Sequence, residues 1–130
     1  MKTKYYNNQV VRKRFGQNFL KDDYILEQIV EKAQISKDDF VLEIGPGHGV
    51  LTERLLTKAK EIVAVELDRD LVAKLQVKFK DTPNLKIVSQ DILDFDLNSI
   101  DFTNYDLKNR KAIGNIPYYI TTPIIMKIIN

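Results

Sequence analysis

The sequence predicts an α/β fold in which a parallel β-sheet is flanked by helices on both faces. Four short apolar or β-branched runs alternate with segments of helical periodicity. The helical segments between these runs are about 10–15 residues long, which suits crossover helices between parallel strands. The first run ends in a glycine-rich turn that leads into a helix. Together these observations predict strand–helix–strand units in a single sheet.

The first half of the chain supplies two helices and two strands. Residues 23–35 repeat apolar side chains at intervals that predict an amphipathic helix. Residues 40–44 form an apolar run halted by a glycine, as expected of a central strand. From Leu51 the apolar spacing is helical again, and the β-branched run 61–65 predicts the second strand.

The second half continues the alternation. Residues 71–79 carry an apolar helical face that ends at a Thr-Pro-Asn sequence, and residues 85–89 predict a third strand. Residues 95–109 lack a clear period and favour a short helix with a polar loop. Residues 111–116 predict a fourth strand. The Thr-Pro pair at 122–123 is typical of a helix start.

Length and composition limit the classes of protein. The 130 residues suffice for one domain or part of one, and 44% of them are hydrophobic. No apolar run reaches the roughly 18 residues of a membrane span, and no signal peptide is recognisable. We therefore expect a soluble cytoplasmic protein with no membrane partner. The absence of cysteine and the single histidine argue against a metal site.

The chain begins with a basic arm, residues 1–21, which precedes the α/β region at 22–130. This arm contains no acidic residue. Its basic residues are Lys2, Lys4, Arg12, Lys13, Arg14 and Lys21. Such an arm is either a solvated terminus or a segment that contacts phosphates, and nucleic-acid chemistry elsewhere would favour the second interpretation.

Three glycines, Gly45, Gly47 and Gly49, follow the first predicted strand. A tight turn alone does not need this many, so we expect the backbone here to approach a ligand closely. A dinucleotide site requires the spacing G-x-G-x-x-G, and Val50 occupies the position of its third glycine. The spacing therefore weakens the dinucleotide interpretation.

Acidic residues follow the second and third strands. Glu66 lies about 20 residues beyond the glycines, where a carboxylate can bind both hydroxyls of a ribose. Asp91 can accept a hydrogen bond from an adenine amino group, and Ile92 offers the ring an apolar surface. Asp68 and Asp70 are expected instead at a helix start. Solvated acids are common at strand ends, but together with the glycine turn this pair predicts an adenosine pocket.

Asn115, Ile116, Pro117 and Tyr118 follow the fourth strand. The amide can accept a hydrogen bond from an exocyclic amine, and the aromatic ring can stack on a base. Proline rigidifies the turn and leaves nearby carbonyls free of strand pairing. These groups can hold a flipped-out adenine. The plainer interpretation is an Asn-capped proline turn with a core tyrosine.

With these motifs in view, the chain resembles the ribosomal RNA adenine-N6,N6-dimethyltransferase family of the KsgA type. The resemblance covers nearly the whole sequence. It rests on residues 16–20, 43–52, 66–68, 90–91 and 114–118. It implies a Rossmann-like, class I fold that binds S-adenosylmethionine and a protein that methylates N6 of adenine in small-subunit ribosomal RNA.

The resemblance also implies roles for individual residues. The residues implied for the cofactor are Gln17, Asn18, Leu20, Gly45, Gly47, Glu66, Asp91, Ile92 and Asn115. The residues implied for catalysis and the target base are Asn115, Pro117 and Tyr118, and the expected RNA contacts are Lys4, Arg12, Lys13 and Arg14. No metal is implied.

More than one function is compatible with these motifs. Ile116 stands where the family usually has leucine, and isoleucine is found there in erythromycin-resistance methylases, which modify large-subunit RNA. Pro46 and residues 16–20 favour the KsgA type. The sequence is also compatible with a non-catalytic RNA-binding or assembly protein and, less well, with an NAD-dependent oxidoreductase.

The sequence stops at Asn130, inside an apolar helical pattern. We therefore expect a piece of a longer protein whose later strands and helical RNA-binding domain are missing. An unpaired edge on the fourth strand would favour self-association of this piece.

Overall fold

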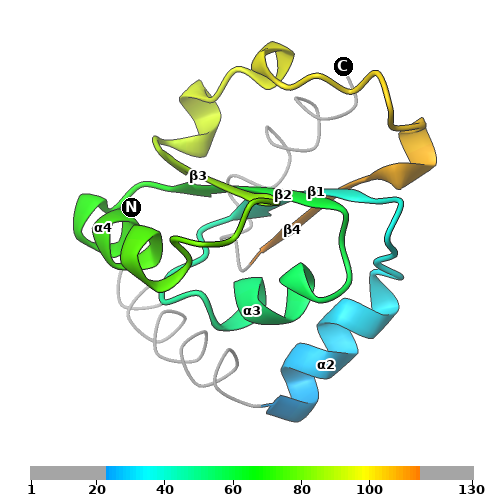
Figure 1. Ribbon diagram of the computed structural model, residues 1–130, viewed down its shortest axis with the longest axis horizontal. Helices are drawn as coiled ribbons and strands as arrows, with labels where there is room; N and C mark the ends of the chain where they lie inside the picture. The colour runs from blue at the N-terminus through cyan, green and yellow to red at the C-terminus, as the bar shows by residue number, and fades with distance from the viewer. Residues whose placement is uncertain (1–22, 115–130) are drawn as a thin grey trace, which may run out of the picture.

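The computed structural model describes residues 23–114, and in this part four parallel strands form one sheet. The strands lie in the order β3-β2-β1-β4 (Figure 1). The described strands are β1 (Phe40–Ile44), β2 (Glu61–Glu66), β3 (Leu85–Ser89) and β4 (Arg110–Gly114). The described α-helices are α2 (Asp23–Lys32), α3 (Val50–Leu56) and α4 (Arg69–Lys78). The predicted α/β fold with a parallel sheet is confirmed.

The two faces of the sheet are covered differently. The helices α2, α3 and α4 lie on one side, and the connection from β3 to β4 crosses the other (Figure 1). That connection contains three short 3₁₀ turns, Ile92–Asp94, Leu97–Ser99 and Leu107–Asn109. The short helix expected within 95–109 is therefore a series of single turns.

Alternating residues of β1 belong to two separate hydrophobic clusters, one on each face of the sheet, because successive side chains of a strand point to opposite faces. Phe40 and Leu42 pack with Val63 of β2 and with Tyr105 of the β3–β4 connection. On the helical face the buried residues come from α2, α3, β1 and β2. They include Leu26, Val30, Val41, Leu55 and Ile62. Each such side chain contributes about 1.5–3 kcal/mol when fully buried, so β1 is fixed from both sides.

The observed boundaries follow the predicted ones closely. The strands at 40–44 and 85–89 are confirmed at the same residues. The first helix ends three residues early because the chain turns at Gln34, whose φ of 54° is left-handed. Asp68 begins α4, as expected, by accepting hydrogen bonds from the backbone N–H groups of Asp70 and Leu71. The helix start predicted at 122–123 lies outside the described residues.

Parallel pairing aligns the carboxyl ends of the strands at one edge of the sheet. Ile44 at the end of β1 pairs with Val65 on one side and with Gly114 on the other. Glu66 at the end of β2 pairs with Ser89 of β3. The glycine turn, the strand-end acids and the end of β4 therefore meet at the same edge.

Candidate functional site

The turn after β1 depends on the conformational freedom of glycine. Gly45, Gly47 and Gly49 have φ values of 68°, 61° and 85°, a region that other residues rarely adopt. At Gly45 and Gly47, no described atom other than those of the glycine and its two neighbours in the chain lies within 4 Å of the place a Cβ would occupy. The backbone of this part of the turn is therefore open to close approach by a ligand.

Gly49 serves a different purpose. A Cβ on Gly49 would lie 2.8 Å from Cε2 of Phe79 and 3.0 Å from Cδ2 of Leu75. The backbone N–H of Gly49 donates to the carbonyl of Pro46 at 2.9 Å and closes the turn. Gly49 thus lets α4 and the turn pack together, while the first two glycines face space that no side chain of residues 23–114 fills.

Glu66 ties the turn to the end of β2. One carboxylate oxygen accepts from the backbone N–H of Gly47 at 3.0 Å, and the other accepts from that of Asp68, also at 3.0 Å. The side chain is 8% exposed. Because each carboxylate oxygen offers more than one lone pair, Glu66 can still accept hydrogen bonds from ligand hydroxyls.

A second carboxylate, Glu43, lies buried near the end of β1, two residues before Gly45. The hydroxyl of Thr52 donates to it at 2.5 Å. Burial raises the pKa of Glu43 to about 7; the hydrogen bond from Thr52 lowers the pKa and the nearby charge of Glu66 raises it. Glu43 had no predicted role of its own. The available signal was a charged residue in an otherwise apolar central strand.

At the end of β3, the predicted adenine contacts occupy different environments. Asp91 accepts from the backbone N–H of Leu93 at 3.0 Å and begins a 3₁₀ turn. Ile92 is buried and belongs to the hydrophobic cluster around Phe40. Its neighbour Leu93 is exposed instead.

Leu67, next to Glu66, is a further exposed apolar residue at this edge, with 67% of its surface accessible. It was not among the predicted site residues. The sequence feature that could have indicated it is an apolar residue between the strand-end acid Glu66 and Asp68, the N-cap of α4.

The end of β4 lies directly beside the start of the glycine turn. A Cβ on Gly114 would lie 2.3 Å from the carbonyl oxygen of Ile44, so only glycine fits there. The predicted adenine clamp begins at the next residue. The clamp residues Asn115, Pro117 and Tyr118 lie outside the described residues. So do the predicted cofactor contacts Gln17, Asn18 and Leu20 and the predicted RNA contacts Lys4, Arg12, Lys13 and Arg14.

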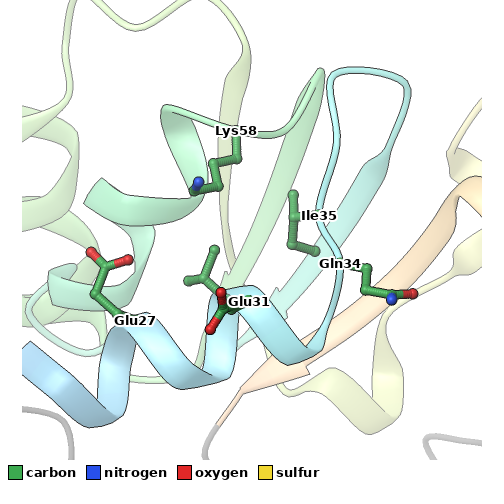
Figure 2. Close-up of a pocket in the computed structure, with 6 residues that line it drawn as sticks. Glu27, Glu31, Gln34, Ile35 and Lys58 are labelled. Carbon is green, nitrogen blue, oxygen red and sulfur yellow. The ribbon is translucent and has the colours of Figure 1, made fainter.

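A surface hollow of about 350 Å³ lies away from these residues, between α2 and the turn that follows α3 (Figure 2). The residues that line it are Glu27, Val30, Glu31, Gln34, Ile35 and Lys58. None of the predicted site residues is among them. Within residues 23–114, no group of three or more His, Asp or Glu side chains is arranged to hold a metal ion. The helices of residues 23–114 all lack the length and apolar character that a membrane-spanning helix requires.

Residues 8–130 match the family described as Ribosomal RNA adenine dimethylase. The chain belongs to this family. Ribosomal RNA small subunit methyltransferase A of Clostridium acetobutylicum is 48% identical over 118 residues, which make up 91% of this chain and 42% of that protein. The chain therefore spans about two fifths of the length of this curated relative.

Two solved structures resemble the chain over most of its length. A dimethyladenosine transferase from Plasmodium falciparum has a TM-score of 0.67 at 30% identity, covering 83% of this chain and 37% of that chain. The 23S rRNA methyltransferase ErmE has a TM-score of 0.69 at 32% identity, covering 84% and 41%. The predicted Rossmann-like methyltransferase fold is confirmed.

Proposed function

We propose that the protein transfers methyl groups from S-adenosylmethionine to N6 of adenines in the RNA of the small ribosomal subunit. One observation carries the proposal: Glu66 fixes the open glycine turn through the N–H of Gly47, directly beside the end of β4. The family to which the chain belongs supports the same activity.

The residues at this edge fit the cofactor in shape and chemistry. The open backbone at Gly45 and Gly47 accommodates the methionine portion, and Glu66 accepts from the ribose hydroxyls. Asp91 accepts from the adenine amino group, and the exposed side chain of Leu67 covers the ring. Gln17, Asn18 and Leu20 complete the proposed set by closing over the cofactor. When bound, S-adenosylmethionine supplies a methyl group already activated by its sulfonium.

The residues after β4 hold the target base in this proposal. The amino nitrogen of adenine is a weak nucleophile because its lone pair is delocalised into the ring. The side-chain oxygen of Asn115 and the carbonyl of Pro117 accept its N–H protons, which localises the lone pair on the nitrogen. Tyr118 stacks on the extruded base. Catalysis then requires alignment more than acid–base chemistry.

The RNA substrate is held by the basic arm in this proposal. Lys4, Arg12, Lys13 and Arg14 neutralise phosphates, a contribution that weakens as salt rises. Ile116 favours a second candidate, the modification of large-subunit RNA, because isoleucine at this position resembles the erythromycin-resistance methylases.

Labelled S-adenosylmethionine distinguishes these candidates when it is offered with undermodified small or large ribosomal subunits. We expect label in small-subunit RNA, recovered as N6,N6-dimethyladenine. Label confined to large subunits would identify the resistance-type activity. Cofactor binding without transfer to either subunit would support a non-catalytic assembly protein. Asn115→Ala should abolish transfer while cofactor binding persists.

A further inference from the structure

Lys78, at the end of α4, joins this helix to the glycine turn. Its ammonium group donates to the backbone carbonyl of His48 at 3.1 Å and pairs with the carboxylate of Glu53 on α3, also at 3.1 Å. The same group lies 5.3 Å from the centre of the Phe79 ring. One side chain therefore connects the turn, the helix that follows the turn, and α4.

The carbonyl that Lys78 binds belongs to the residue between two left-handed glycines. Gly47 and Gly49 each tolerate wide rotation of their peptide groups, so the turn needs external contacts to hold one conformation. Glu66 holds the N–H of Gly47 from β2, and Phe79 packs against Gly49 from α4. Lys78 fixes the peptide between these two points.

The contacts of Lys78 contribute more to orientation than to overall stability. The side chain is 38% exposed and that of Glu53 is 54% exposed. Ion pairs exposed to this degree add little to the free energy of folding because water screens them. A hydrogen bond from a charged donor to a single carbonyl still restricts the rotation of that peptide group.

We propose that Lys78 is a positioning residue for ligand binding, which holds the His48 peptide so that the glycine turn presents its backbone to the methionine portion of the cofactor. The identity of the ligand rests on the proposed function, whereas the positioning of the turn does not. Because Glu66 lies at the other side of the turn, we expect the loss of Lys78 to affect ligands that carry the methionine portion more than adenosine alone.

Calorimetric titration with S-adenosylmethionine, S-adenosylhomocysteine and adenosine tests this inference on the unmodified protein and three variants. Lys78→Met removes the donor and keeps an apolar stem against Phe79, and Lys78→Arg restores a donor. Lys74→Met is the matched control, since Lys74 is an exposed lysine one turn earlier on α4. We expect Lys78→Met to weaken both methionine-bearing ligands about tenfold and to leave adenosine unchanged. Lys78→Arg and Lys74→Met should bind as the unmodified protein does.

Amide hydrogen exchange in the ligand-free protein provides a second, independent measurement. Lys78→Met should accelerate exchange at Gly49 several-fold, while Val41 in β1 and the melting temperature stay unchanged. Unaltered exchange at Gly49 would overturn the positioning role, whichever ligand binds. Equal losses for all three ligands, together with a lower melting temperature, would also overturn it by showing a general structural role. Failure of the unmodified protein to bind S-adenosylmethionine would instead contradict the proposed function.

Discussion

The two ends of the central strand each bury a carboxylate, but in opposite electrostatic environments. Asp39, directly before β1, accepts hydrogen bonds from Asn109 at 2.8 Å, from Lys111 at 2.7 Å and from the backbone N–H of Ser36 at 2.7 Å. Glu43, near the other end, accepts from Thr52 and lies near the charge of Glu66. The two side chains are 0% and 1% exposed.

The difference appears in the direction of the two pKa shifts. Burial alone would raise the pKa of Asp39, but the hydrogen bonds from Asn109, Lys111 and Ser36 and the charge of Lys111 bring it below its ordinary value. Burial raises the pKa of Glu43 to about 7, and Glu66 adds to that rise. The amino end of the sheet is therefore organised for stability. The carboxyl end instead places two carboxylates near each other, and the charge of Glu66 favours the neutral form of Glu43.

Removal of the cation at the amino end should have the largest effect on stability. Lys111→Met should lower the free energy of unfolding by about 3–5 kcal/mol at pH 7, because it leaves the charge of Asp39 buried without its partner. Urea denaturation measures this loss, and Lys108→Met is the control because Lys108 is exposed in the preceding turn. A loss below about 1 kcal/mol would contradict the stabilising role of this network.

Acidification should remove the contribution of Asp39 as well. Its folded-state pKa lies below the ordinary value of 3.8, so the stabilisation is present above that value. It is lost as the pH falls through the lowered pKa.

Glu43→Gln tests the carboxyl end and should have the opposite pH dependence. The pKa of Glu43 rises from an ordinary 4.5 to about 7, so its stabilising contribution is complete below pH 4.5 and is lost as the pH rises through 7. Over that interval the unmodified protein should lose about 3 kcal/mol that the glutamine variant keeps. At pH 8 Glu43→Gln should therefore be the more stable protein.

Urea denaturation at pH 5 and pH 8 measures this difference. Glu31→Gln, at an exposed position on α2, is the control and should follow the unmodified protein at both values. If the free energy of unfolding changed with pH in the same way for Glu43→Gln and for the unmodified protein, ionisation of Glu43 would not destabilise the fold.

Within the carboxyl end, alanine substitutions at Gly47 and Gly49 should separate ligand binding from stability. Gly49→Ala should cost about 2–3 kcal/mol of stability, because its left-handed backbone and the contact with Phe79 both oppose a Cβ. Gly47→Ala should cost only about 1 kcal/mol, since within residues 23–114 no atom beyond its chain neighbours would contact the added Cβ. Thermal unfolding measures both. For S-adenosylmethionine binding we expect the reverse order: Gly47→Ala should weaken the affinity more than Gly49→Ala does. If the two variants had equal effects on affinity and on stability, the assignment of Gly47 to the ligand would be contradicted.

The sequence predicted those features that are formed by neighbouring residues in the chain. The glycine turn and Glu66 could be predicted because the spacing of glycines and the ends of apolar strands can be recognised in the sequence. The network at Asp39 was not, because its partners Asn109 and Lys111 lie 70 and 72 residues away. Residues 95–109 gave no period because single 3₁₀ turns are too short to produce one.

The sequence predicts an apolar surface for the adenine ring at Ile92, but it carries no sign of which side chain after β3 faces the core. Ile92 is buried and Leu93 exposed because of the direction in which the 3₁₀ turn leaves Asp91. That direction is set by packing against the cluster around Phe40, which brings together residues distant in the sequence. Glu43 lies on the opposite face of β1, where Thr52 of α3 donates to it. A charged residue in an apolar strand is visible in the sequence, but the burial that raises its pKa depends on residues from other elements.

We propose that the carboxyl end of the sheet binds S-adenosylmethionine, whereas the amino end stabilises the fold. Titration of the ¹⁵N-labelled protein with S-adenosylhomocysteine, followed by amide chemical shifts, distinguishes the two ends. We expect the shifts to concentrate at Gly45, Gly47 and Asp68, with Asp39 and Lys60 at the amino end unchanged. Shifts confined to Asp39 and Lys60, or no shifts at millimolar ligand, would contradict the claim.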